Sequence, residues 1–186
     1  TVLMYAGNFG ELQNLETVIE AARLLRDRHD IVIALVGSGV TETRLRAQAE
    51  QYDLRNVRFL PPQPFERISD VLALADAQLV TLKDVPVLRS TLPSKLQANL
   101  AAGQPIIGSV SGDAAAVIED AAAGFTAPPG DAPALANAMM SFADMSSDAR
   151  NRLRTNSRIA YEQTFSEKVI GDELSALLHK AAKSRG

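Results

Sequence analysis

The sequence predicts an α/β fold: a Rossmann-like, doubly wound parallel sheet of about six strands with C-terminal helices. Two observations support this prediction. Short, continuous apolar runs recur as far as residue 128, and such runs are typical of strands that are covered on both faces. Segments with apolar residues at helical spacing separate these runs, and this alternation favours parallel strands joined by right-handed crossovers.

Six segments fit buried strands because they are short and largely apolar. In chain order they are 2–7 (VLMYAG), 31–37 (IVIALVG), 57–61 (VRFLP), 77–82 (AQLVTL), 104–109 (QPIIGS) and 124–128 (GFTAP). In open parallel sheets, ligands bind at the carboxyl ends of the strands, so the loops that follow these segments are the candidate binding loops.

Helices are expected between the strands, where apolar residues recur three or four positions apart. Thr41 and Asp131 stand where N-caps are expected. Four of the predicted helices have these apolar stripes, in chain order: Leu15, Val18, Ile19, Ala22 and Leu25; Leu45, Ala49 and Tyr52; Leu92, Leu96 and Leu100; and Leu135, Ala138, Met139 and Phe142. A further short helix is predicted over residues 112–121.

Two further helices are predicted at the C-terminal end, because no strand pattern follows about residue 146. Leu174, Leu177 and Leu178 give the last of them an apolar face. That face packs either on the domain itself or on a partner.

Length and composition fit one globular domain, since the chain has 186 residues, of which 46% are hydrophobic. We expect this domain to span residues 1–186, with a core of about 1–145 and terminal helices of about 146–184. Because the chain opens inside its first strand, we also expect a missing domain on its N-terminal side.

The residue types exclude several kinds of function. Cysteine is absent, which excludes disulfides and cysteine-based sites and suits a reducing compartment. The net charge of −3 argues against nucleic acid as the main partner. No apolar run approaches the ~20 residues of a membrane span. His29 and His179 lie far apart in polar, helical surroundings, so they fit surface residues better than a catalytic pair. No metal-ligand cluster or carboxylate pair is visible.

The first two candidate loops are rich in glycine. Gly7 and Gly10 in "GNFGELQN" would let the backbone pass close to a ligand, and the following helix offers free amides. The pattern is not the dinucleotide fingerprint G-x-G-x-x-G. Gly37 lies in the second loop, "VGSGV". Ordinary glycine turns explain both loops equally well.

The third loop, in "RSTLPSKLQANLAAGQPII", contains a misplaced charge. Lys95 falls in the first turn of a helix, where the macrodipole favours an anion. Pro93 suits that first turn, and Ser90, Thr91 and Ser94 add hydroxyl groups. These groups indicate a phosphate site. The alternative is a solvated surface lysine whose aliphatic stem covers the edge of the sheet.

Taken together, these stretches resemble the C-terminal, nucleotide-sugar-binding domain of retaining glycosyltransferases of family 4, also called glycosyl transferases group 1. The resemblance covers nearly the whole chain. "GNFGELQNLE" with "PSKLQ" is similar to enzymes that add amino sugars or deoxysugars in bacterial surface-polysaccharide pathways. The stretches that carry the resemblance are "YAGNFGELQNLETVIEAARLL", "IALVGSGVTETRLRAQAEQYDLRNVRFLPP", "ADAQLVTL", "LPSKLQANLAAGQPII" and "GDAAAVIEDAAAGFTAPPGDAPALANAM".

The resemblance implies one half of a GT-B-type enzyme, in which two Rossmann-like domains face each other across a cleft. This chain would hold the donor, a nucleotide-diphosphate sugar that we expect to be UDP-linked. The other domain would take a saccharide or polyprenyl-linked acceptor, and the isolated domain would be inactive. The family retains the anomeric configuration without a dedicated carboxylate nucleophile. No cofactor or metal is implied. The implied location is cytoplasmic, with peripheral association at the inner face of the plasma membrane.

The sequence departs from the family pattern at four positions. Ser90 and Ala98 stand where many members carry glutamates, the second of which holds the ribose. Asn8 and Gln13 stand where many members carry an arginine and a lysine that neutralise the diphosphate. Lys95 would then be the only cation at the helix start, and backbone groups of residues 60–64 would read the base. The predicted donor-binding residues are Gly7, Asn8, Gly10, Gln13, Gly37, Ser90, Thr91, Ser94, Lys95 and Ala98.

Three alternatives remain. A nucleotide-sugar 2-epimerase half would share the architecture but needs acid–base carboxylates and histidines in the cleft. A non-catalytic, glycosyltransferase-like binding domain would explain the loss of both glutamates. A receiver-like signalling domain would need an acidic cluster at the strand ends, and "YAGN" and "LVGSG" offer none. A test of nucleotide binding separates the glycosyltransferase and the epimerase from the other two classes.

Overall fold

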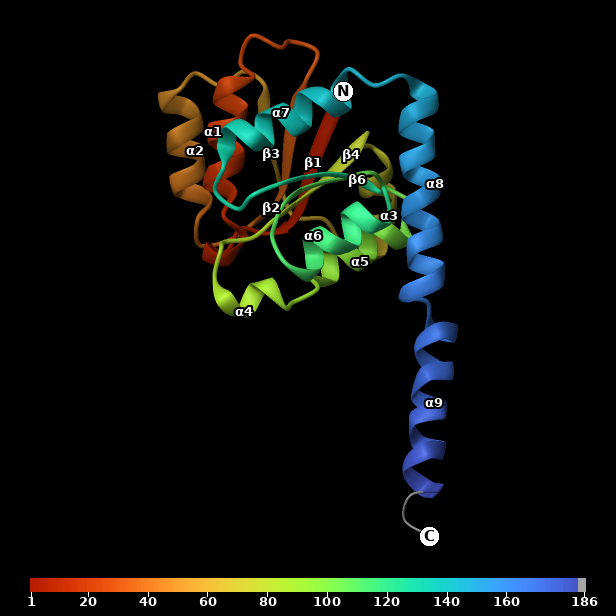
Figure 1. Ribbon diagram of the computed structural model, residues 1–186. Coiled ribbons are helices and arrows are strands. Elements are labelled where there is room, and N and C mark those ends of the chain that lie inside the picture. The colour runs from red at the N-terminus through yellow and green to blue at the C-terminus, as the bar shows by residue number, and fades with distance from the viewer. Residues whose placement is uncertain (184–186) are drawn as a thin grey trace.

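The computed structural model describes residues 1–183. Its centre is a six-stranded sheet of order β3-β2-β1-β4-β5-β6, in which each pair of neighbours runs parallel (Figure 1). Every predicted apolar run forms one strand, so the predicted doubly wound α/β fold is confirmed. The strands are β1 (Val2–Asn8), β2 (Val32–Ser38), β3 (Val57–Leu60), β4 (Ala77–Thr81), β5 (Ile106–Ser109) and β6 (Gly124–Ala127).

Helices connect the strands and continue beyond the sheet. Two of them, α3 and α4, were not predicted, because six and four residues are too few to show a helical period. The predicted end of the last helix, at about residue 184, lies outside the described residues. The helices are α1 (Leu15–Leu24), α2 (Glu42–Gln51), α3 (Ile68–Ala73), α4 (Pro86–Arg89), α5 (Ser94–Ala101), α6 (Asp113–Asp120), α7 (Ala132–Ala143), α8 (Ser147–Thr164) and α9 (Glu167–Lys183), with the 3-10 turns η1 (Glu11–Gln13) and η2 (Phe65–Arg67).

Apolar side chains pack on both faces of the sheet. Leu3 and Tyr5 of β1 belong to the cluster that α1, α2 and α7 cover. Met4, between them, points to the opposite face and packs with Val71 of α3. Further along that face, Leu96 of α5 and residues of α6 cover β4 and β5. This alternation follows from the two-residue period of a strand, and it explains why the strands read as continuous apolar runs.

Two predicted helix starts differ in detail. Thr41 does not cap α2 with its side chain; its hydroxyl donates to the carbonyl of Phe9 at 2.9 Å instead. Helix α5 begins at Ser94, so Leu92 precedes it and Pro93 is its N-cap, with extended ψ of 135°. A residue before proline is biased away from helical angles, which explains the late start. The Asp131 cap is confirmed, since its carboxylate accepts from the Ala134 amide at 2.9 Å.

The C-terminal helices run along the side of the sheet domain and away from it (Figure 1). Helix α8 packs on α5, and the buried Ser157 hydroxyl donates to the Gln104 carbonyl at 2.8 Å. The predicted apolar face of α9 is exposed: Leu174, Leu177 and Leu178 are 55%, 64% and 62% exposed. Within residues 1–183, this face therefore does not pack on the domain itself, and no helix there is long and apolar enough to cross a membrane.

Candidate functional site

A cavity of about 630 Å³ lies at the carboxyl ends of β1 and β4. The strand order reverses between these two strands, and such a switch point is where open α/β sheets bind ligands. The volume lies within the range of small-molecule sites, ~300–1,000 Å³. The lining residues are Tyr5, Ala6, Gly7, Asn8, Gln13, Ile68, Leu72, Val80, Thr81, Leu82, Leu88, Thr91, Pro93, Ser94, Lys95, Ala98 and Asn99.

Most of the predicted donor-binding residues line this cavity. Gly37 lines an adjoining hollow of about 230 Å³, which shares Gly7 with the cavity and includes Pro62 and Gln63 of the predicted base-reading segment. Gly10 and Ser90 line neither space. The residues that the fold brings together in the cavity are Gly7, Asn8, Gln13, Thr91, Ser94, Lys95 and Ala98.

Glycines permit close packing beside the cavity. Gly7 has a φ of +146°, and a Cβ there would overlap the Lys95 ammonium. Gly7 is also paired with Gly37 on the next strand. A Cβ at Gly10 would meet the side-chain amides of Gln13 and Asn8, so a larger residue there would displace both amides. Gly7 requires glycine for its backbone angle.

Lys95 points into the sheet rather than into solvent. Its ammonium donates to the Ala6 carbonyl and lies 4.1 Å from the centre of the Tyr5 ring. Burial lowers the pKa of Lys95 to about 8. Among the described residues, no carboxylate forms an ion pair with it, whereas the other cations near the site are paired. The alternative of a solvated surface lysine is therefore wrong.

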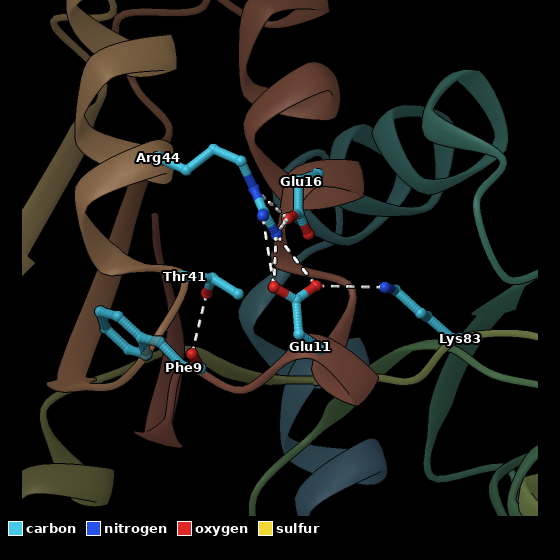
Figure 2. A network of polar contacts seen from close by, with 6 residues as sticks. All are labelled: Phe9, Glu11, Glu16, Thr41, Arg44 and Lys83. Atoms are coloured by element: carbon cyan, nitrogen blue, oxygen red, sulfur yellow. Dashed lines mark hydrogen bonds and ion pairs between the residues drawn. The ribbon is translucent and has the colours of Figure 1, made fainter.

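Ion pairs hold the first loop on its outer side (Figure 2). The Glu11 carboxylate of η1 lies 3.1 Å from Arg44 of α2 and 3.3 Å from Lys83, which follows β4. Arg44 also pairs with Glu16 of α1. Arg44 first, and Lys83 after it, hold the pKa of Glu11 below its ordinary value. This cluster joins three segments that are distant in sequence.

Main-chain hydrogen bonds fix the same loop. The Phe9 amide donates to the Ser38 carbonyl at 2.7 Å, and the Thr41 hydroxyl returns a bond to the Phe9 carbonyl (Figure 2). The Lys83 amide donates to the Leu12 carbonyl at 2.9 Å. The loop between β1 and α1 is thus anchored on both sides of β1.

The cavity lacks acidic and imidazole groups. None of its lining residues is Asp, Glu or His. Both histidines are exposed, as predicted, and His29 borders a separate hollow of about 520 Å³ near the start of β2. Among the side chains that the structure describes, no group of three or more His, Asp or Glu residues is placed to hold a metal ion. The cavity can therefore bind and neutralise an anion, but it offers no carboxylate for proton transfer.

Sequence reasoning missed three polar residues of this cavity, Tyr5, Thr81 and Asn99. Tyr5 lies inside a predicted strand, and nothing in the sequence indicates that its ring meets a lysine 90 positions later. Asn99 could have been found from the sequence. It follows Leu96 by three residues and precedes Leu100, so a polar amide interrupts the apolar face of a predicted helix.

Comparison with known proteins identifies close sequence relatives. A family model described as glycosyl transferases group 1 matches residues 1–160. The putative colanic acid biosynthesis glycosyl transferase WcaI of Escherichia coli K12 is 42% identical over 102 residues, which is 55% of this chain and 25% of the relative. The putative colanic acid biosynthesis glycosyltransferase WcaL of the same strain is 30% identical over 173 residues, which is 90% of this chain and 42% of the relative. The chain thus spans less than half the length of these relatives.

Solved structures with the same fold are more distant in sequence. Anabaena Alr3699/HepE in complex with UDP-glucose superposes with a TM-score of 0.80 over 96% of this chain and 48% of that chain, at 18% identity. WaaG, a glycosyltransferase involved in lipopolysaccharide biosynthesis, gives a TM-score of 0.70 over 89% and 43%, at 23% identity. The family model and the fold agree with the resemblance that the sequence motifs carry: this chain belongs to the glycosyl transferases group 1 family.

Proposed function

We propose that this chain is the donor-binding half of a retaining glycosyltransferase of cell-surface polysaccharide biosynthesis, and that it binds a UDP-linked sugar. The observation that carries this proposal is Lys95. Its ammonium lies in the switch-point cavity with no carboxylate partner among the described residues. A buried cation without a counter-charge is costly, so an anionic ligand is its natural partner.

The surroundings of Lys95 suit a diphosphate. Helix α5 begins beside it, and no side chain caps the first turn, so the free amides there can donate to phosphate oxygens. Gly7 brings the end of β1 close to the same point. An ammonium and helix-terminal amides would stabilise the charge that develops on the leaving diphosphate. No cofactor or metal takes part in this proposal.

The relatives support the wider assignment. Two of them are named for colanic acid biosynthesis, and HepE was solved with UDP-glucose. Because the chain spans less than half of the relatives, we assign the acceptor to an N-terminal domain that faces the cavity. A saccharide or polyprenyl-linked acceptor, carried at the cytoplasmic face of the membrane, fits this assignment. The "GNFGELQNLE" and "PSKLQ" stretches favour an amino sugar or deoxysugar as the transferred group.

The alternatives have less support. A 2-epimerase needs acid–base groups beside the sugar, and no Asp, Glu or His lines the cavity. Transfer with retention, assisted by the leaving phosphate, needs no such group. A non-catalytic binding domain would not need a partly buried lysine at the switch point, because an unpaired charge there lowers stability without benefit.

Calorimetric titration with UDP, GDP and ADP tests the proposal. We expect the unsubstituted chain to bind UDP, and Lys95→Ala to bind it about 10- to 100-fold more weakly, since a charged hydrogen bond is lost. Lys180→Ala, on the exposed surface of α9, is the matched control and should bind normally. Equal affinity in both variants would contradict the role of Lys95. No binding of any nucleotide diphosphate would contradict donor binding by this chain.

A further inference from the structure

Asn99 presents an unsatisfied hydrogen-bond donor inside the cavity. Its side chain is 1% exposed, and its amide nitrogen has no hydrogen-bond partner among the described residues. Asn99 also belongs to the cavity lining. A buried amide without a partner destabilises a fold, and native proteins rarely retain one without a reason. Because Asn99 belongs to the wall of the cavity, a ligand there could supply the missing partner once the side-chain amide turns towards it.

The position of Asn99 relative to Lys95 says which part of a ligand it meets. The two residues are four apart on α5, so they lie on the same face of the helix, about 6 Å apart along its axis. Lys95 is at the helix start, where the phosphate site is proposed. Asn99 lies one turn further along the helix, and the cavity that it lines also has apolar side chains such as Leu72 and Val80 in its wall.

The chemistry of this inner end favours an uncharged group. No carboxylate lines the cavity, and Lys95 is its only cationic lining residue. A neutral amide donor against an apolar wall suits a carbonyl or hydroxyl oxygen better than a second phosphate. In a transferase, the sugar must remain reachable for an acceptor that arrives from outside. The buried end should therefore hold the nucleoside of the leaving group.

We propose that Asn99 is a specificity-determining residue of the donor site, and that its side-chain amide donates a hydrogen bond to an uncharged oxygen of the donor's nucleoside. This inference rests on the proposed function. The neighbouring residue, Ala98, is exposed and stands at a position where many family members carry a glutamate. In this chain the amide of Asn99, one residue later, would contact the nucleoside in place of that carboxylate.

The test compares UDP with inorganic pyrophosphate by calorimetry. Asn99→Leu keeps the side-chain size and removes the amide, so we expect UDP affinity to fall about tenfold, the effect of one neutral hydrogen bond. Pyrophosphate affinity should not change, because it has no nucleoside. Lys95→Ala should weaken both ligands. Asn151→Leu, at an exposed asparagine of α8, is the matched control. Its affinities should equal those of the unsubstituted chain.

Four analogues of UDP identify the nucleoside oxygen. If a ribose hydroxyl accepts the bond, 2′-deoxy-UDP or 3′-deoxy-UDP binds more weakly than UDP, and Asn99→Leu abolishes that difference. If a base carbonyl accepts it, CDP shows the loss for the 4-carbonyl, where an amino group replaces the oxygen, and 2-thio-UDP shows it for the 2-carbonyl, where sulfur replaces the oxygen. These analogues act on the unsubstituted chain, so they also serve if Asn99→Leu does not fold.

The possible failures are distinct. If Asn99→Leu folds and binds UDP as tightly as the unsubstituted chain, or if none of the four analogues binds more weakly than UDP, the role of Asn99 is overturned while the proposed function stands. An equal loss for UDP and pyrophosphate would also overturn it, since the residue would then act on the phosphate site. If the unsubstituted chain binds no nucleotide diphosphate, the proposed function fails and the role of Asn99 fails with it.

Discussion

Replacing Lys95 by methionine should stabilise the folded chain and weaken its binding of nucleotide diphosphates. Methionine has a similar length and leaves the packing of the lysine stem largely intact. What disappears is a charge that the fold holds next to the Tyr5 ring and the Ala6 carbonyl without a carboxylate partner among the described residues.

The size of the gain follows from the pKa of Lys95, which burial lowers from 10.5 to about 8. At about 1.4 kcal/mol for each pH unit between the two values, the charged form loses about 3 kcal/mol of folding free energy. The Tyr5 ring and the Ala6 carbonyl return part of this through contacts that methionine cannot make in full, roughly 1–2 kcal/mol. We therefore expect Lys95→Met to raise the free energy of unfolding by about 1–3 kcal/mol at pH 7.

The shifted pKa of Lys95 also predicts how the stability difference between the two proteins changes with pH. The folded pKa lies below the unfolded one, so the unfolded chain binds more protons between pH 8 and 10.5, and the stability of the unsubstituted chain rises through that window. Below pH 8 the full cost of the charge is present. The advantage of Lys95→Met should accordingly be largest below pH 8 and shrink towards pH 10.5. Burial raises the pKa of Tyr5, but that residue is common to both proteins and does not alter their difference.

Urea denaturation at pH 7 and pH 10 measures both effects. Lys180→Met, on exposed α9, is the control and should change stability little at either pH. A Lys95→Met variant that is less stable than the unsubstituted chain at pH 7 would refute the reasoning. So would an advantage that does not decrease between pH 7 and pH 10.

Two further predictions concern ligand affinity. UDP affinity should decline above about pH 8, because the free chain loses the Lys95 proton there; titrations from pH 7 to 9.5 measure this, and an affinity that stays constant over the series would contradict it. Glu11→Gln should leave the melting temperature almost unchanged, since its ion pairs with Arg44 and Lys83 are exposed, yet weaken UDP binding by loosening the loop that carries Asn8. Thermal melts and calorimetry on the same samples separate the two effects, and unaltered UDP affinity would show that the loop does not need this anchor.

Local contacts were predictable from the sequence and distant ones were not. Asp131 caps a helix through an amide three residues later, within reach of a sequence pattern. Thr41 looked like a similar cap, but its hydroxyl bonds to Phe9, 32 positions earlier. The competing acceptor exists only because β1 and β2 lie side by side, which no local pattern contains.

The same distinction applies to the site. The misfit of Lys95 with the helix dipole is local, so the sequence alone indicated an anion there. Its contacts with Tyr5 and Ala6 come from β1, about 90 positions earlier in the chain, and they show that Lys95 is not a solvated surface lysine. Asn99 was overlooked because a single polar residue on an apolar helix face gains meaning only once its burial is known.

The charge of the cavity explains how one lysine can suffice. The family resemblance implies two cations and two carboxylates around the donor, whose charges largely cancel. Here neutral residues stand at all four positions, and Lys95 remains without a lining carboxylate. The cavity is therefore more positive by about one charge than a site in which the four charged groups balance. No lining carboxylate would repel a bound diphosphate, so its attraction to Lys95 would be opposed less. If the proposed function holds, affinity should depend more strongly on Lys95 here than on either cation where two share the phosphate, and neutral groups such as Asn99 would supply the discrimination that the carboxylates would otherwise provide.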